Sequence, residues 1–159
     1  MKLVVACPEC TIEKDLTDFF GSDIRIVSAL AGLLELDAFE YAESFNSFVG
    51  NEAIEEIIVF VSDQCKVLED SMLGNSNQNI SSFRMLDEII LTNKKELLSL
   101  PDRKHRLNRL MGFTLNKEAA DIAHSSFVGA KVQEGDILLR TFYKIDGDLV
   151  EYSFPNFWD

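Results

Sequence analysis

Apolar and polar positions along the first third of the chain change period several times. Residues 2–7, KLVVAC, form a short apolar run of the kind that makes a buried strand. Residues 12–20, IEKDLTDFF, place apolar side chains at helical spacing and end at Gly21. Residues 23–30, DIRIVSAL, predict a second strand, and residues 31–50 predict an amphipathic helix. The pattern therefore alternates strand and helix.

The middle of the chain continues this alternation. Residues 54–63, IEEIIVFVSD, are β-branched and apolar on both faces, which is typical of a central parallel strand. Residues 71–83 are polar around a glycine and predict a loop. Residues 83–100 predict a helix that ends before Pro101, because a proline restricts the residue before it.

Two alternating runs near the C-terminus are separated by Asp146 and Gly147, which predicts a β-hairpin. The whole order predicts an α/β fold: a mostly parallel central sheet flanked by helices, with an antiparallel edge hairpin near the C-terminus. With 159 residues, 47% of them hydrophobic, the chain holds enough apolar material for one core. We therefore expect a single domain over residues 1–159.

Charge narrows the range of partners. The chain has 27 Asp and Glu against 15 Lys and Arg, for a formal net charge of −12. Basic residues gather only in RKHRLNR, residues 103–109. Because nucleic-acid phosphates require a broad basic face, we expect no nucleic-acid partner, and the same balance argues against an anionic membrane.

The N-terminus lacks a charged segment followed by an apolar stretch of signal-peptide length, and no run approaches the ~20 apolar residues of a membrane span. We expect a cytoplasmic protein. Its three cysteines are an odd number without a secretion signal, which argues against a disulfide framework. They predict reduced thiols or thiolate ligands.

Two of the cysteines follow the first strand directly, in VVACPECT, residues 4–11. Cys7 and Cys10 have the Cys-x-x-Cys spacing that chelates one metal ion when it lies in a turn. The same spacing before a helix also fits a thiol-disulfide exchanger, although a low thiolate pKa needs positive neighbours and this chain is acidic. A third interpretation is that the cysteines pack as small apolar side chains.

Five segments, taken in order, help to choose among these three interpretations of the cysteines. They are VVACPECT, the short helix DLTDFFG, the strand leading to Ala31 and Gly32, AFEYA at residues 38–42, and IIVFVSDQC. Together with the closing VQEGDILLRTFYKIDGDLVEY they resemble the β-class carbonic anhydrases, a zinc enzyme family built on a mostly parallel sheet. The resemblance covers nearly the whole chain, and it implies the same fold.

The resemblance also implies where a zinc site would lie. The family's first core strand ends in Cys-x-Asp-Ser-Arg, which places Cys7 on the first zinc ligand and Glu9 on the aspartate. The family's central strand is followed by His-x-x-Cys, which places Ser62 on the histidine and Cys65 on the second cysteine. A neutral hydroxyl is a poor zinc donor, so the implied ligand set is broken at Ser62.

Other departures affect the chemistry around the implied zinc. Thr11 stands where the family has the arginine that pairs with the aspartate, and Lys66 stands where the family has a glycine. A threonine cannot replace the charge of an arginine or its fork of donors. The parts that handle protons and substrate are therefore missing or altered.

One compensation is visible in the sequence. Cys10 is extra to the family pattern, so Cys7, Cys10 and Cys65 with Glu9 or Asp63 would complete a four-coordinate zinc site. Such a site would be closed and therefore structural. The alternative, that these cysteines are packed apolar residues, stays open.

Three functions follow as hypotheses. The first is a divergent carbonic-anhydrase-like protein without efficient carbon dioxide hydratase activity, acting as a binding or regulatory protein for a small anion or small molecule. The second is an active zinc-dependent lyase or hydrolase on carbon dioxide or a similar small substrate, in which Glu9 or Asp63 takes the proton. The third is a dithiol redox protein that uses Cys7 and Cys10. The resemblance also implies a homodimer, formed through the helix that bears AFEYA.

Overall fold

The computed structural model describes residues 1–9, 13–155 and 157. Its centre is a five-stranded sheet in the order β2-β1-β3-β4-β5, in which β4 and β5 are antiparallel and the other pairs are parallel. The strands are β1 (Lys2–Ala6), β2 (Ile24–Ser28), β3 (Glu56–Ser62), β4 (Leu138–Ile145) and β5 (Asp148–Tyr152). The expected fold class is confirmed, and β3 is the central strand with all seven residues buried.

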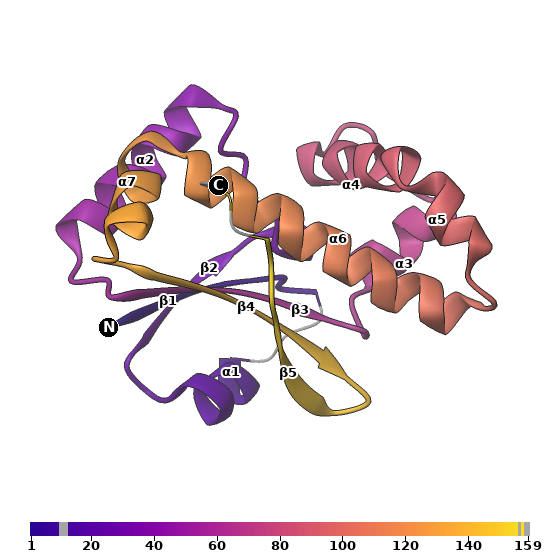
Figure 1. Ribbon diagram of the computed structural model, residues 1–159, viewed down its shortest axis with the longest axis horizontal. Coiled ribbons are helices and arrows are strands. Elements are labelled where there is room, and N and C mark those ends of the chain that lie inside the picture. The colour runs from indigo at the N-terminus through magenta and orange to yellow at the C-terminus, as the bar shows by residue number, and fades with distance from the viewer. Residues whose placement is uncertain (10–12, 156, 158–159) are drawn as a thin grey trace.

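The helices cover the two faces of the sheet unequally (Figure 1). One short helix, α1 (Glu13–Phe20), lies on one face, and all the other helices lie on the opposite face. These are α2 (Phe39–Asn51), α3 (Lys66–Met72), α4 (Ser81–Thr92), α5 (Lys94–Ser99), α6 (Arg103–His124) and α7 (Ser126–Glu134). In the described residues, no helix is long and apolar enough to cross a membrane.

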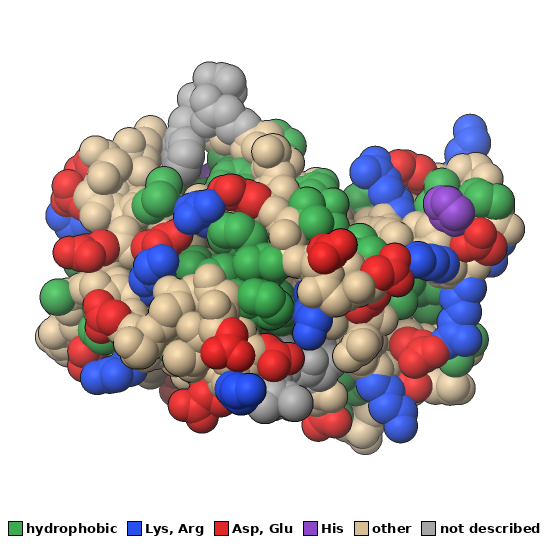
Figure 2. Space-filling model, turned by 90° about the horizontal axis from the view of Figure 1, so that it is seen from below, with side chains coloured by type: hydrophobic (Ala, Val, Ile, Leu, Met, Phe, Trp, Pro, Cys, Tyr) green, Lys and Arg blue, Asp and Glu red, His purple; other side chains and the backbone are tan. Residues whose placement is uncertain are grey.

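Successive side chains along each strand point to opposite faces of the sheet, so the apolar core has two parts, one on each face. The larger apolar core lies under α2 to α7 and includes Leu3, Val5, Ile57, Val59 and Leu115. The smaller core lies between the sheet and α1, where Val4, Ile58, Phe60, Leu16 and Phe20 meet. Figure 2 looks at this second face from below and shows apolar side chains in its middle. One eight-residue helix therefore has to cover most of this face.

The structure corrects two helix predictions. The helix expected over residues 31–50 begins only at Phe39, because Ala31 and Gly32 have φ values of +56° and +73°, outside the range of a right-handed helix. They form a 3₁₀ turn, Leu30–Gly32. The helix expected over residues 83–100 is broken at Asn93, whose side-chain amide donates to the Ile89 carbonyl at 2.8 Å.

The hairpin prediction is confirmed. Asp146 and Gly147 both have positive φ, +53° and +91°, as a two-residue hairpin turn requires. At its other end the hairpin is joined to the sheet by Arg140, which donates to Glu56 on β3 at 3.1 Å and to Glu151 on β5 at 2.7 Å. These ion pairs link three neighbouring strands on the same side of the sheet as α1.

Candidate functional site

Cys7 and Cys65 meet at one edge of the sheet. Cys7 follows the last residue of β1, and β1 pairs in parallel with β3, so that Ala6 lies opposite Phe60. After β3 ends at Ser62, a turn closed by the Cys65 N–H donating to the Ser62 carbonyl at 3.0 Å directs the chain back. Parallel neighbouring strands therefore bring the two cysteines together, as the sequence predicted.

The two sulfur atoms are 3.6 Å apart. This is a non-covalent contact, since a disulfide bond is about 2.05 Å long. Cys7 is 0% exposed and Cys65 is 1% exposed, and both belong to the larger apolar core. Any ion held by the pair would therefore be enclosed by protein on the core side.

Ser62 is buried beside this pair, but its hydroxyl is engaged in the turn. It donates to Asp63 Oδ1 at 3.5 Å and accepts from the Gln64 N–H at 3.2 Å. The side chain that occupies the family's histidine position is thus short, neutral and hydrogen-bonded to its own turn. It offers nothing like an imidazole nitrogen to a metal ion.

The two candidate carboxylates lie in different settings. Glu9 is exposed on the loop after Cys7. Asp63 is half-buried, and its Oδ2 accepts the Asp146 N–H at 2.9 Å, while its own N–H donates to the Lys144 carbonyl at 3.0 Å. Asp63 therefore holds the turn after β3 against the β4–β5 hairpin.

The expected metal site depends on a residue beyond the described part of the chain. Within residues 1–9, 13–155 and 157, no three Cys, His, Asp or Glu side chains are grouped closely enough to hold a metal ion. Cys10 and Thr11 lie outside the described residues. A ligand set built on Cys7 and Cys65 with Cys10 and Glu9 or Asp63 thus stays a prediction.

Neither histidine lies near the cysteines. His105 is exposed near the start of α6, where its ring Nδ1 is 2.9 Å from both Asp102 oxygens. Its backbone N–H and ring hold the pKa of Asp102 below the ordinary value. His124 is exposed at the end of α6, with its ring 5.9 Å from that of Phe157.

One buried carboxyl group, on α6, was not predicted from the sequence. Glu118 on α6 is 0% exposed, its Oε2 accepts the Leu34 N–H at 3.1 Å, and its Oε1 has no partner among the described residues. Burial raises its pKa well above the ordinary value. The signal was present, since Glu118 continues the apolar stripe of Met111, Leu115 and Ile122.

A hollow of about 280 Å³ adjoins Cys7 on the α1 side of the sheet. Its lining includes Cys7, Pro8 and Leu16, with Glu13 and Ser28 as polar groups. Among the described residues that line it, Glu13 is the carboxylate, and its charge does not favour an anion. The Cys7 side chain is 0% exposed and packs in the larger core, so the hollow lies beside this residue but does not open onto its sulfur.

Comparison with solved structures places the fold among the β-carbonic anhydrases. A tetrameric β-carbonic anhydrase from the filamentous ascomycete Sordaria macrospora matches with a TM-score of 0.78 and 14% identity, over 96% of this chain and 80% of that chain. The β-carbonic anhydrase CafA of the fungal pathogen Aspergillus fumigatus matches with a TM-score of 0.79 and 17% identity, over 96% of this chain and 74% of that one.

The Coccomyxa β-carbonic anhydrase in complex with acetazolamide matches with a TM-score of 0.75 and 13% identity, over 94% of this chain and 70% of that chain. No family model and no curated protein sequence matches the chain. At such low identity the likeness establishes the fold alone. The resemblance seen in the sequence is therefore confirmed as one of structure.

A catalytic zinc ion does not fit the residues that the structure describes. Such an ion needs three protein donors and one open position, and here two thiols stand beside an alcohol that is engaged in its own turn. The chain has the fold of these enzymes, and Ser62 stands where the resemblance implies a histidine.

Proposed function

We propose that this chain is a divergent protein of the β-carbonic anhydrase fold that works in the cytoplasm as a binding or regulatory protein, without efficient carbon dioxide hydratase activity. The observation that carries the proposal is Ser62. It is buried at the position where the family resemblance implies a histidine ligand, and its hydroxyl is already hydrogen-bonded to Asp63 and Gln64.

A charged or polar group that touches the reacting atoms supplies about 2 to 4 kcal/mol of transition-state stabilisation. This chain departs from the pattern that the resemblance implies at both the histidine and the carboxylate–arginine pair. Losing both would slow hydration by several powers of ten, since about 1.4 kcal/mol is a factor of ten in rate. The hollow beside Cys7 supports a binding role in its place.

A closed zinc site remains part of the proposal. Cys7 and Cys65 are close enough for one ion to bind both, and Cys10 follows Cys7 by three positions. Glu9, exposed on the same loop, suits a fourth ligand better than Asp63, whose Oδ2 is used by the hairpin. Such an ion would tie the loop to the sheet and stabilise the fold.

Metal analysis tests the closed site. Protein purified without added zinc should contain about one zinc ion per chain, and Cys10→Ser, Cys7→Ser and Cys65→Ser should each lose most of it. A zinc content unchanged in Cys10→Ser would remove Cys10 from the ligand set. Absence of zinc in every sample would leave the cysteines as packed apolar residues.

The redox alternative predicts something different. Thiols counted before and after mild oxidation should show a Cys7–Cys10 disulfide if the chain is a dithiol exchanger. We expect no such bond, because a low thiolate pKa needs positive neighbours and this chain is acidic. A reversible Cys7–Cys10 disulfide would favour the redox function over the binding function.

We also propose a homodimer through α2. Phe39, the first residue of α2, is 73% exposed, and burying such a side chain is a usual reason for an interface. Light scattering should give twice the monomer mass for the wild type and a monomer for Phe39→Asp. A wild-type monomer at micromolar concentration would contradict the homodimer.

A further inference from the structure

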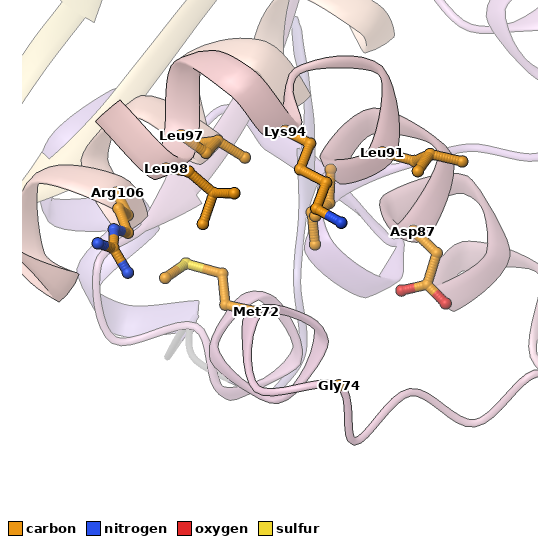
Figure 3. A pocket seen from close by; sticks show the side chains of 9 residues that line it. Met72, Gly74, Asp87, Leu91, Lys94, Leu97, Leu98 and Arg106 are labelled. Carbon is orange, nitrogen blue, oxygen red and sulfur yellow. The ribbon is translucent and has the colours of Figure 1, made fainter. Parts of the chain in front are cut away.

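A second cavity lies in the layer of helices on the side of the sheet opposite α1 (Figure 1). Its volume is about 540 Å³, within the range of roughly 300 to 1,000 Å³ typical of small-molecule sites. Helices α3, α4, α5 and α6 all contribute to it (Figure 3). The residues that line it are Met72, Gly74, Asp87, Ile90, Leu91, Lys94, Leu97, Leu98 and Arg106.

The walls of this cavity are apolar and partly uncovered. Leu91 is 71% exposed and Leu98 is 61% exposed. Each square ångström of apolar surface left in water costs about 25 cal/mol relative to burial. Met72 and Leu98 face each other across the cavity in Figure 3, so an apolar body between them would cover both.

The charge around the cavity differs from that of the rest of the chain. Lys and Arg side chains gather at the end of the molecule where α5 and the start of α6 lie, at the right of Figure 2. Several are neutralised by carboxylates: Arg103 by Glu69, Lys104 by Asp146 and Arg109 by Glu96.

Two cations line the cavity itself. Within the described part of the chain, neither Lys94 nor Arg106 has a carboxylate partner. An anion bound at the cavity would supply the missing counter-charge.

The anion would bind at the end of the cavity that Arg106 lines (Figure 3). Its Nη2 donates to the Leu100 carbonyl at 3.3 Å, while its Nε is buried with no hydrogen-bond partner among the described residues. Lys94 stands on the other side of Leu98 in Figure 3, nearer to Asp87. Asp87 itself accepts from Ser76 at 2.7 Å and from Gln78. The Asp87 carboxylate makes the Lys94 side less favourable for a bound anion than the Arg106 side.

We propose that this cavity binds an amphipathic monocarboxylate, with its carboxylate against Arg106 and its hydrocarbon body along Met72, Leu97 and Leu98. A guanidinium recognises a carboxylate through two parallel hydrogen bonds, and the leucines gain from being covered. The hydrocarbon supplies most of the contact area, and Arg106 fixes its direction. This site is separate from the hollow at Cys7, and the inference deepens the proposed binding function by naming a ligand class.

Titration calorimetry on the full chain tests the site with decanoate as the probe. We expect saturable binding of one decanoate per chain, and no saturable binding of acetate, which lacks the apolar body, or of decylammonium, which has the opposite charge. Arg106→Gln should weaken decanoate binding about tenfold or more, because it removes a charge-assisted hydrogen bond. Lys104→Gln is the matched control and should leave the affinity unchanged, since Lys104 pairs with Asp146 away from this cavity.

A second variant guards against a folding defect in Arg106→Gln. Leu98 is mostly exposed, so Leu98→Asp should fold and should abolish binding by placing a negative charge beside the hydrocarbon. The inference is overturned if decanoate does not saturate, if decylammonium binds equally well, or if Leu98→Asp binds like the wild type.

The outcome can be separated from that of the proposed function. A chain that hydrates carbon dioxide and still binds decanoate would overturn the function and leave this site standing. A chain that is inactive as a hydratase and does not bind decanoate would overturn this site alone.

Discussion

The sulfur atoms of Cys7 and Cys65 lie 3.6 Å apart although 58 positions separate the residues in the sequence. Parallel pairing of β1 with β3 accounts for this proximity, and the turn after Ser62 completes it. The pair retains two of the donors that the family resemblance implies for zinc. Ser62 stands at the position of the third donor, and its hydroxyl is hydrogen-bonded within its own turn. This is why we propose a binding role.

Asp63→Ala tests whether the half-buried carboxylate is structural. Removing the acceptor of the Asp146 N–H should lower the free energy of unfolding by about 1 kcal/mol and the melting temperature by about 2 to 4 °C, with no change in zinc content. Asp148→Ala, an exposed position on the same hairpin, is the control and should change stability by less than about 0.5 kcal/mol. Loss of zinc in Asp63→Ala but not in Asp148→Ala would make Asp63 a ligand.

Glu118→Gln should stabilise the protein, increasingly so as pH rises. The buried carboxyl has a raised pKa, so the fold favours its neutral form. Its favourable contribution is complete below the unfolded-state pKa and is lost as pH rises through the folded-state pKa. Glu118→Gln should therefore be more stable than the wild type at pH 8, and the difference should shrink toward pH 5.

The Glu118→Gln comparison is made by thermal unfolding of both proteins between pH 5 and pH 8. The groups that act on Glu118 stay the same in both: the Leu34 N–H and Lys117 favour its charged form, and Asp121 disfavours it. Tyr41, whose pKa is raised partly by Glu118, does not ionise in this range. Glu43→Gln, at an exposed position, should show no pH-dependent gain. A Glu118→Gln variant that is equally destabilised at every pH would refute the buried neutral carboxyl.

Gly129→Ala should be severely destabilising. A Cβ at Gly129 would lie 2.2 Å from the Ala123 carbonyl oxygen, a backbone atom at the end of α6 that cannot move aside cheaply. We expect a loss of about 3 kcal/mol in urea unfolding. Gly50→Ala is the matched helical control, because there the nearest atoms belong to the Phe127 ring, which can shift. Equal stability of the two variants would contradict the close packing of α6 against α7.

Much of the fold follows from local patterns in the sequence. Period-2 and fully apolar runs predict the strands, and Asp146 with Gly147 predicts the hairpin, since few other pairs accept positive φ together. The pattern fails where conformation is set by distant packing. Ala31 adopts a left-handed conformation that alanine rarely takes, next to Gly32, which lies against the Phe60 carbonyl of β3.

The candidate site was predictable in part. Strand order brings Cys7 to Cys65, and the family resemblance singles out Ser62 between them. Glu118 was missed although its place in an apolar stripe is the local sign of burial, and its contact with Leu34 depends on packing that the sequence does not show. The cavity at Arg106 needs four helices to come together, which no local pattern encodes.

Whether Ser62 rules out catalysis is best measured by the initial rate of carbon dioxide hydration by the zinc-supplemented wild-type protein, followed by stopped flow with a pH indicator. We predict a rate equal to that of buffer, because Ser62 cannot complete a catalytic ligand set. A rate clearly above buffer that is lost in Cys7→Ser and Cys65→Ser would contradict it.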